Sequence, residues 1–148
     1  MDDDQYFINQ RLINAAKRGE EENVEEFVLD SENKVDINCT DSIGETSLHW
    51  AAKNNHAEVI KVLIRLKANV NAVQAGSLDT PLHKAAFKNN LDAIRILVVD
   101  GKANTNLKNK DDRTPLQLAN DVECRKLLVP SVDTSVDDVV DEEDSDNE

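Results

Sequence analysis

Two histidines lie in nearly identical contexts, His49 in "TSLHWAA" and His83 in "TPLHKAA". Histidine serves both acid–base catalysis and metal binding. Either use would require a carboxylate, a cysteine or another histidine at a matching spacing, and neither motif provides one. The two cysteines, Cys39 and Cys124, show no metal-ligand spacing, and the four glycines form no phosphate-binding loop. We therefore expect no enzymatic activity, metal or cofactor, and we interpret both cysteines as reduced, small apolar residues.

The segments that carry the histidines repeat along the chain. "ETSLHWAAKNNH" at 45–56 returns as "DTPLHKAAFKNN" at 79–90 and, in shorter form, as "RTPLQLAND" from 113, so that Thr46, Thr80 and Thr114 are spaced by 34 residues. A fixed period of about 20 to 50 residues is typical of stacked arrays. The sequence therefore predicts layers that must fit their neighbours.

Each repeat begins with the signals of a helix start. Thr80 is placed as an N-cap and Pro81 as the first helical residue, where its missing N–H costs nothing. Leu82, Ala85 and Ala86 then follow at i, i+3 and i+4, which gives one apolar helix face. The paired alanines allow a neighbouring helix to approach closely.

A second helix is predicted over 57–66 and again over 91–100. Each carries an apolar stripe, and a helix pair of this kind cannot bury its apolar face alone, so the units must stack. The stripes consist of Val59, Ile60, Leu63 and Ile64 in the one and Ala93, Ile94, Leu97 and Val98 in the other.

These motifs resemble the T-P-L-H-x-A pattern of the ankyrin-repeat family over residues 5–129. The resemblance implies an all-α fold, a solenoid of stacked helix-turn-helix units joined by β-turn or hairpin fingers. We expect the repeat domain to occupy residues 1–129, as a small, stand-alone protein with an acidic tail. Its predicted units are an N-terminal cap at about 5–38, repeats at about 39–72 and 73–106, and a shortened C-terminal cap at 107–129.

Several positions depart from the family pattern. Asn55 and Asn89 stand where the family has a glycine between paired helices, and both tolerate a left-handed conformation. Asp112 replaces the glycine of the last fingertip, and the third unit has an extra residue, Lys102, before "ANTN". The cap carries two or three inserted residues around 31–34. The resemblance also implies that the motif histidines bond to backbone and to their own repeat's threonine, bracing adjacent layers.

The outer positions of the first helices form triplets across the predicted inner groove, by which ankyrin-type proteins hold partners. The triplets make a basic ladder with two aromatic residues, and Trp is a favoured residue at interfaces. Trp50 either packs between adjacent helices or anchors a partner, and Phe87 is open to the same two uses. The lysines either contact a partner or are simply solvated. The triplets are Asn14, Lys17 and Arg18; Trp50, Lys53 and Asn54; and Lys84, Phe87 and Lys88.

The fingertips offer a second candidate surface. Ile43 and Leu78 are apolar where exposed turns are normally polar, so they either contact a partner or tuck against neighbouring fingers. Lys110 and Arg113 add positive charge on the third finger.

Charge is unevenly distributed along the chain. The net charge is −13, yet residues 46–113 sum to +5, with −9 on either side. The net negative charge of the chain disfavours binding to nucleic acids and to anionic membranes. Residues 130–148 contain nine acidic residues and no aromatic, basic or glycine residue, so we expect a disordered acidic tail.

These features favour a non-enzymatic protein–protein interaction module, an adaptor or regulatory inhibitor that holds its partner in the groove. The alternative is a regulatory subunit or assembly chaperone that acts through the acidic tail. We expect a protein partner, no small-molecule substrate, no membrane contact and a monomer. The acidic N-terminus lacks the features of a secretion signal and no stretch is long enough to span a membrane, so we expect a cytoplasmic protein, with the nucleus as a second compartment.

Overall fold

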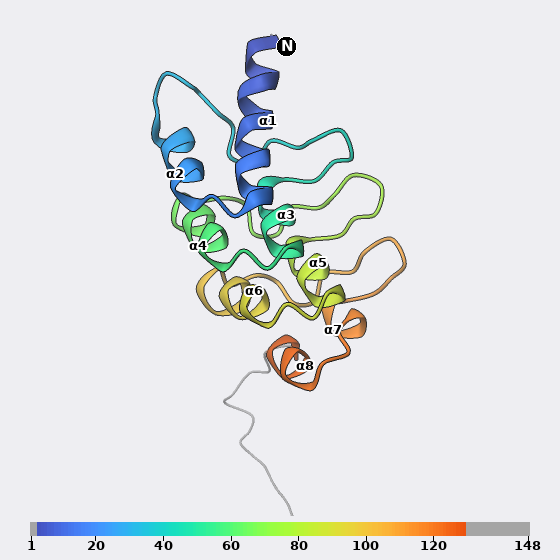
Figure 1. Ribbon diagram of the computed structural model, residues 1–148. Coiled ribbons are helices and arrows are strands. Elements are labelled where there is room, and N and C mark those ends of the chain that lie inside the picture. Colours follow the sequence, from blue (N-terminus) through green and yellow to red (C-terminus); the bar gives the residue numbers. More distant parts are fainter. Residues whose placement is uncertain (1–2, 130–148) are drawn as a thin grey trace, which may run out of the picture.

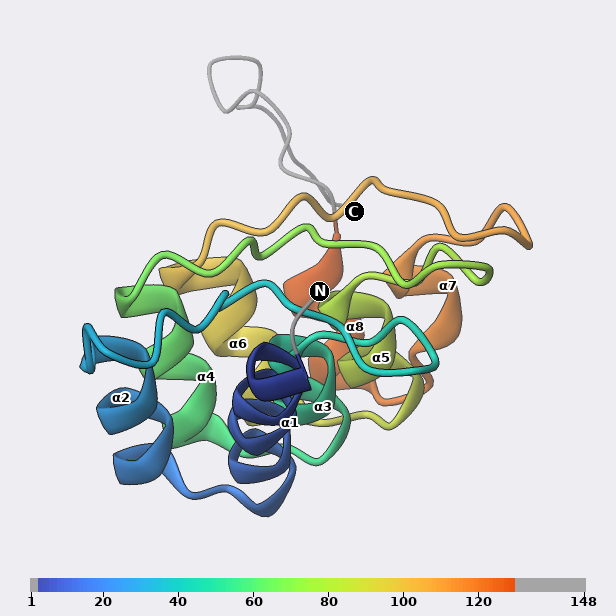
Figure 2. The same cartoon turned by 90° about the horizontal axis from the view of Figure 1, so that it is seen from above.

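The computed structural model describes residues 3–129, which form four two-helix layers stacked in chain order (Figure 1). First and second helices make two rows, and the connecting fingers project from one side (Figure 2). Within residues 3–129 there is no β-strand, and an isolated antiparallel bridge joins Thr40 to Thr46, so the predicted all-α repeat solenoid is confirmed. The layers are α1 (Asp3–Arg18) with α2 (Glu21–Leu29), α3 (Ser47–Lys53) with α4 (Ala57–Arg65), α5 (Pro81–Phe87) with α6 (Leu91–Arg95) and η1 (Ile96–Asp100), and α7 (Pro115–Leu118) with α8 (Val122–Leu128).

The first helices begin where the threonine motif predicts. Thr46 Oγ1 accepts a hydrogen bond from the His49 N–H at 3.2 Å, and Thr80 Oγ1 accepts one from the His83 N–H at 3.2 Å. Pro81 is the first residue of α5, as expected for a ring that fixes φ and needs no donor. The side chain thus supplies a partner for a helix-end N–H that the helix itself leaves free.

The core is one continuous seam between the two rows of helices. Leu48 and Leu82 are buried at the same register of successive layers, and the paired alanines beside them are fully buried. Each leucine contributes about 2 kcal/mol by burial. Of the predicted stripes, Ile64 and Val98 are only partly buried at the edge. The fully buried stripe residues are Val59, Ile60, Leu63, Ala93, Ile94 and Leu97.

The second helix of the third layer differs from the prediction of one regular helix over 91–100. Its α-helical part ends at Arg95 and residues Ile96–Asp100 form a π-helical turn, closed by the Gly101 N–H donating to the Ile96 carbonyl at 3.0 Å. A π turn takes up one additional residue without breaking the helix. The extra residue of this unit is therefore accommodated before Lys102, inside the helix.

Asn55 and Asn89 adopt the left-handed conformation expected at their positions, and Asp112 at the last fingertip adopts it as well. Asn55, Asn89 and Asp112 have φ of 59°, 56° and 63°. The asparagines have a second role, because Asn55 Oδ1 accepts from the Ala93 N–H at 3.1 Å and so satisfies the start of α6 in the next layer. Asn89 Oδ1 likewise accepts from the N–H groups of residues 120 and 121, each at 2.9 Å.

The two ends of the chain differ from the interior layers. The first helix starts at Asp3 and is 16 residues long, more than twice the length of α3 or α5, which have 7 each. The last layer is short, since α7 spans four residues. The acidic segment 130–148, for which the sequence predicts disorder, lies outside the described residues.

Candidate functional site

Both motif histidines are structural. His49 Nδ1 accepts from the Thr46 N–H at 3.1 Å and lies 2.9 Å from Thr46 Oγ1. The proton therefore sits on Nε2, which donates to the Asp79 carbonyl in the next layer at 2.8 Å. His83 repeats this geometry and donates to the Arg113 carbonyl at 2.8 Å. Burial lowers the pKa of both imidazoles, so they are neutral at pH 7, and the predicted bracing of adjacent layers is confirmed.

The cysteines are also unsuited to chemistry. Cys39 and Cys124 are buried and free. Burial raises the pKa of the Cys39 thiol to about 12, and burial followed by Asp121 raises that of Cys124, so both are protonated at neutral pH. Across residues 3–129 no group of three histidine, cysteine or acidic side chains is arranged to hold a metal ion.

The first and second layers are joined by a contact that the sequence did not reveal. His56 Nε2 donates to the Lys17 carbonyl at 2.8 Å, and Asn54 Nδ2 donates to the same oxygen at 3.1 Å. Asn54, which the sequence predicts to contact a partner, is exposed, and its amide also joins α3 to the end of α1. Its position in the motif gave no signal for this role.

Trp50 lies at the centre of the predicted groove and is half-buried. Its indole Nε1 donates to Asp41 Oδ2 at 2.8 Å, while Lys17 Nζ and Lys53 Nζ lie 4.3 Å and 3.8 Å from the ring centroid. Such cation–π contacts each contribute about 0.5–1 kcal/mol at partly exposed sites. Burial works against ionisation of Asp41, but hydrogen bonds from the Glu45 N–H and the indole outweigh it and lower its pKa. Trp50 is therefore held in one orientation and remains partly exposed.

The lysine ladder is not uniformly basic, which corrects the sequence-based expectation. Glu45 is 1% exposed, and its Oε2 lies 2.9 Å from Lys53 Nζ while its Oε1 lies 3.8 Å from Lys84 Nζ. Lys84 also lies 3.6 Å from Asp79 Oδ2. The carboxylates were missed, although one signal was available: Glu45 and Asp79 both directly precede a motif threonine. Much of the positive charge of Lys53 and Lys84 is therefore compensated within the protein.

The C-terminal half of the groove is different. Phe87 is 67% exposed and Lys88 beside it is exposed as well. Among residues 3–129, no carboxylate lies within ion-pair distance of Lys88. The two residues border a hollow of about 340 Å³ that is further lined by Lys53, Asp79, His83, Lys84, Asn109, Asp111 and Leu118.

The fingertips are tied to one another through backbone groups. Gln74 Nε2 donates to the Ile43 carbonyl at 2.9 Å, and the Lys110 N–H donates to the Ser77 carbonyl at 2.8 Å. Ile43 and Leu78 are both about half exposed, so neither tucks fully against its neighbours. The other fingertip candidates, Lys110 and Arg113, are exposed. Arg18, at the end of α1, is exposed too, and Lys17 is half-buried against Trp50.

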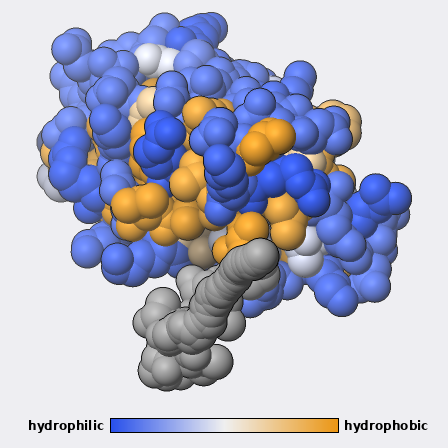
Figure 3. Space-filling view, turned by 90° about the horizontal axis from the view of Figure 1, so that it is seen from below, coloured by the Kyte–Doolittle hydropathy of each residue, from blue (hydrophilic) through white to orange (hydrophobic). Residues whose placement is uncertain are grey.

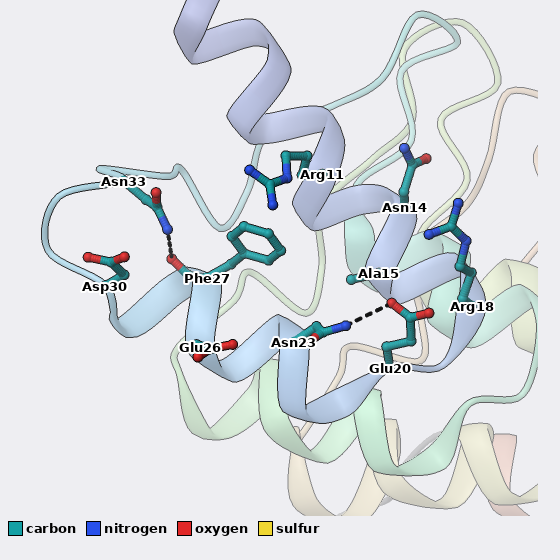
Figure 4. A pocket seen from close by; sticks show the side chains of 10 residues that line it. All are labelled: Arg11, Asn14, Ala15, Arg18, Glu20, Asn23, Glu26, Phe27, Asp30 and Asn33. Carbon is teal, nitrogen blue, oxygen red and sulfur yellow. Dashed lines mark hydrogen bonds between the residues drawn. The ribbon is translucent and has the colours of Figure 1, made fainter.

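A second hollow, of about 480 Å³, lies between α1 and α2 at the N-terminal end of the stack (Figure 4). Arg11 Cζ lies 4.7 Å from the ring centroid of Phe27. The other residues that line the hollow include both acidic and basic side chains. Asn23 and Glu26 occupy the helix positions that Val59 and Val62 occupy in α4. Polar residues at the outer face of a terminal layer keep that end soluble, and we assign this hollow to capping.

The stacked helix pairs, the interlayer histidines and the open groove define a repeat protein of the ankyrin class. The family model "Ankyrin repeats (3 copies)" matches residues 12–109 and 66–139, and the chain belongs to the ankyrin-repeat family. Ankyrin repeats indicate a protein-interaction module and suggest protein partners. No helix within residues 3–129 is both long and apolar enough to cross a membrane.

Similar proteins differ widely in size. The chain is 34% identical to osteoclast-stimulating factor 1 of Monopterus albus, over 94% of this chain and 66% of that protein. It is 35% identical to alpha-latrotoxin-Lg1a of Latrodectus geometricus, over 71% of this chain and 8% of the toxin. It is 36% identical to palmitoyltransferase Hip14 of Drosophila melanogaster, over 61% of this chain and 14% of the enzyme. The chain thus spans two thirds of these relatives or much less, and its similarity to the transferase covers only part of that enzyme.

Proposed function

We propose that this chain is a non-enzymatic adaptor or regulatory inhibitor that holds a segment of a partner protein in the groove lined by its first helices and fingertips. The observation that carries the proposal is Phe87, a large aromatic side chain that is mostly exposed beside a hollow and next to Lys88, which has no carboxylate partner within residues 3–129. Exposed aromatic residues at the centre of a surface are frequent binding hot spots.

Trp50 supports the same function from the other half of the groove. Because Asp41 and Lys53 fix its ring, a partner would not have to order it on binding, which reduces the entropic cost of association. The groove therefore combines a fixed aromatic residue, Trp50, with an open hollow beside Phe87. We propose that the partner segment runs along both, with the fingertip residues Ile43, Leu78, Lys110 and Arg113 and the α1 residues Lys17 and Arg18 at its edge.

The test compares affinity capture by the full chain with capture by a Phe87→Ala/Lys88→Ala variant. Both side chains are exposed, so their removal should leave the fold intact, and loss of a hot-spot aromatic residue should weaken the partner's binding by about tenfold or more. A Lys61→Ala/Val99→Ala variant, altered at exposed positions in the second-helix row, is the matched control. Equal recovery of the partner by all three proteins would exclude the groove.

The same assay separates the alternative function. A variant with the nine acidic residues of 131–148 changed to amides alters none of the groove residues. Binding that survives the Phe87 variant but is lost in the amide variant, with steep dependence on salt, would favour a regulatory subunit or chaperone that acts through the acidic segment. Binding that survives in the amide variant favours the groove.

The free cysteines indicate the cellular compartment in which such a module would act. Cys39 and Cys124 are both reduced and buried, a pattern common in the reducing cytoplasm and nucleus. We place the interaction in the cytoplasm, with the nucleus as a second compartment, and in a monomeric protein.

A further inference from the structure

The C-terminal end of the stack lacks the cover that every interior layer receives. Leu48 and Leu82 are buried because a further layer packs against them, whereas Leu116, at the same register of the last layer, is only partly buried. In a solenoid each unit contacts only its neighbours, so the last unit needs either polar residues or another element on its outer face. The last layer of this protein has polar cover only in part.

Helix α8 shows the same incomplete capping. Arg125 provides a polar cap for α7, since its Nη1 donates to the Leu116 and Ala119 carbonyls at 2.9 Å each. Val122 at the start of α8 and Val129 just after its end are nevertheless 64% and 56% exposed. Figure 3 looks onto this end and shows hydrophobic residues gathered between hydrophilic ones. We call Leu116, Val122 and Val129 the end face.

The chain itself continues from this place. Residue 129 belongs to the end face, and 19 further residues follow it. Within them Val132, Val136, Val139 and Val140 recur at i, i+4, i+7 and i+8, the spacing of one apolar helix face. The ankyrin family match also runs to residue 139, ten residues beyond Val129.

We propose that residues 131–140 pack across the end face as a closing layer, with the four valines against it and the acidic side chains toward solvent. The composition of this segment predicts disorder because it cannot bury enough apolar area alone. An existing apolar face removes that obstacle, since each valine would then be buried against side chains that are already fixed. Ten residues at 1.5 Å per residue span about 15 Å, enough to run back along the seven-residue α8.

The proposal has a direct test in the full chain by disulfide trapping. A segment that returns antiparallel to α8 brings Val139 and Val140 near Val122, so Val122→Cys/Val139→Cys and Val122→Cys/Val140→Cys should each form an intramolecular disulfide under mild oxidation. The native cysteines are buried and should not compete. Val122→Cys/Asp141→Cys is the matched control, because residue 141 lies on the opposite side of the same helical period and should cross-link at least about tenfold more slowly.

Two results would overturn the proposal. Cross-linking of the valine pairs no faster than the control would show that the segment does not cover the end face. Disulfides that form between two chains, seen as a dimer mass without reductant, would show that a second copy covers it instead.

A stability measurement checks the proposal independently of the trapping geometry. The variant Val136→Asn/Val140→Asn should lower Tm by about 3 °C or more, whereas Thr134→Asn/Ser135→Asn, off the centre of the valine stripe, should leave it unchanged. A Tm equal to wild type in the valine variant would contradict the proposed packing, since loss of two buried valines must destabilise the closing layer.

Discussion

The imidazole of His49 in the second layer donates from Nε2 to the carbonyl oxygen of Asp79 in the third, at 2.8 Å. His83 makes the same bond from the third layer to the fourth, through Arg113. Each imidazole thus completes the cap of its own helix with one nitrogen and holds the next finger with the other. These buried bonds fix the spacing of the layers and with it the shape of the groove.

The first prediction separates the two roles of His83. The last layer already shows a glutamine at the equivalent position, where Gln117 Oε1 accepts from the Thr114 N–H at 2.9 Å. His83→Gln should therefore keep the cap and lose the interlayer bond, at a cost of about 1 kcal/mol. His83→Ala loses both and leaves buried polar groups without partners, so it should cost about 3 kcal/mol. Urea unfolding of both variants measures the difference.

The outcome distinguishes bracing from simple capping. If the interlayer bond is unimportant, His83→Gln will match wild type while His83→Ala remains destabilised. Equal destabilisation of the two variants would instead mean that the cap contributes nothing.

The second prediction concerns pH. Burial lowers the pKa of His49 and His83 in the folded state, so below about pH 6.5 the unfolded chain binds protons more readily than the folded one. The stability that neutral imidazoles provide is then complete above pH 6.5 and is lost as pH falls. Unfolding free energy measured from pH 7 to pH 5 should decrease, with a shallower slope in His83→Gln. An unchanged slope in that variant would contradict a buried neutral His83.

The third prediction tests the carboxylate beneath the groove. Glu45→Ala leaves Lys53 without its partner at 2.9 Å, and Lys53→Ala leaves a nearly fully buried carboxylate, so each should cost about 3 kcal/mol. A double-mutant cycle should give a coupling energy above about 1 kcal/mol. The matched control is Glu58 with Lys61, a pair at 3.4 Å in which both side chains are more than half exposed, and its coupling should be about 0.3 kcal/mol. Similar couplings in the two cycles would argue against a structural role for Glu45.

The local order of the sequence predicted the fold well. The threonine caps and the apolar stripes determine where each helix begins and which side of it is buried, and the period of 34 repeats these features in every layer. The structure shows the helices and the layer contacts that this pattern predicts. Asn55 and Asn89 were predicted to be left-handed for the same reason, because a helix-to-helix turn requires that conformation at one defined position.

The side-chain network of the groove could not be predicted in the same way. Glu45 lies eight residues from Lys53 along the chain, and only the path of the finger brings the two together. Asp41 reaches Trp50 by the same path. Periodicity identifies which residues share a helix face, but it does not give the distance from a finger to that face, so the ladder was predicted to be more basic than it is.

The last prediction concerns a left-handed residue that is not an asparagine. Lys102, which follows Gly101 after the π-helical turn, has φ of 54°, a conformation that costs an ordinary side chain about 1 kcal/mol. Lys102→Gly should relieve that cost and raise the unfolding free energy by about 0.5–1 kcal/mol, despite the greater flexibility of glycine in the unfolded chain. Lys102→Ala is the control, because it removes the same exposed side chain and keeps the strain. Chemical denaturation measures the unfolding free energy of both variants. Equal stability of the two would show that the left-handed backbone at Lys102 carries no strain.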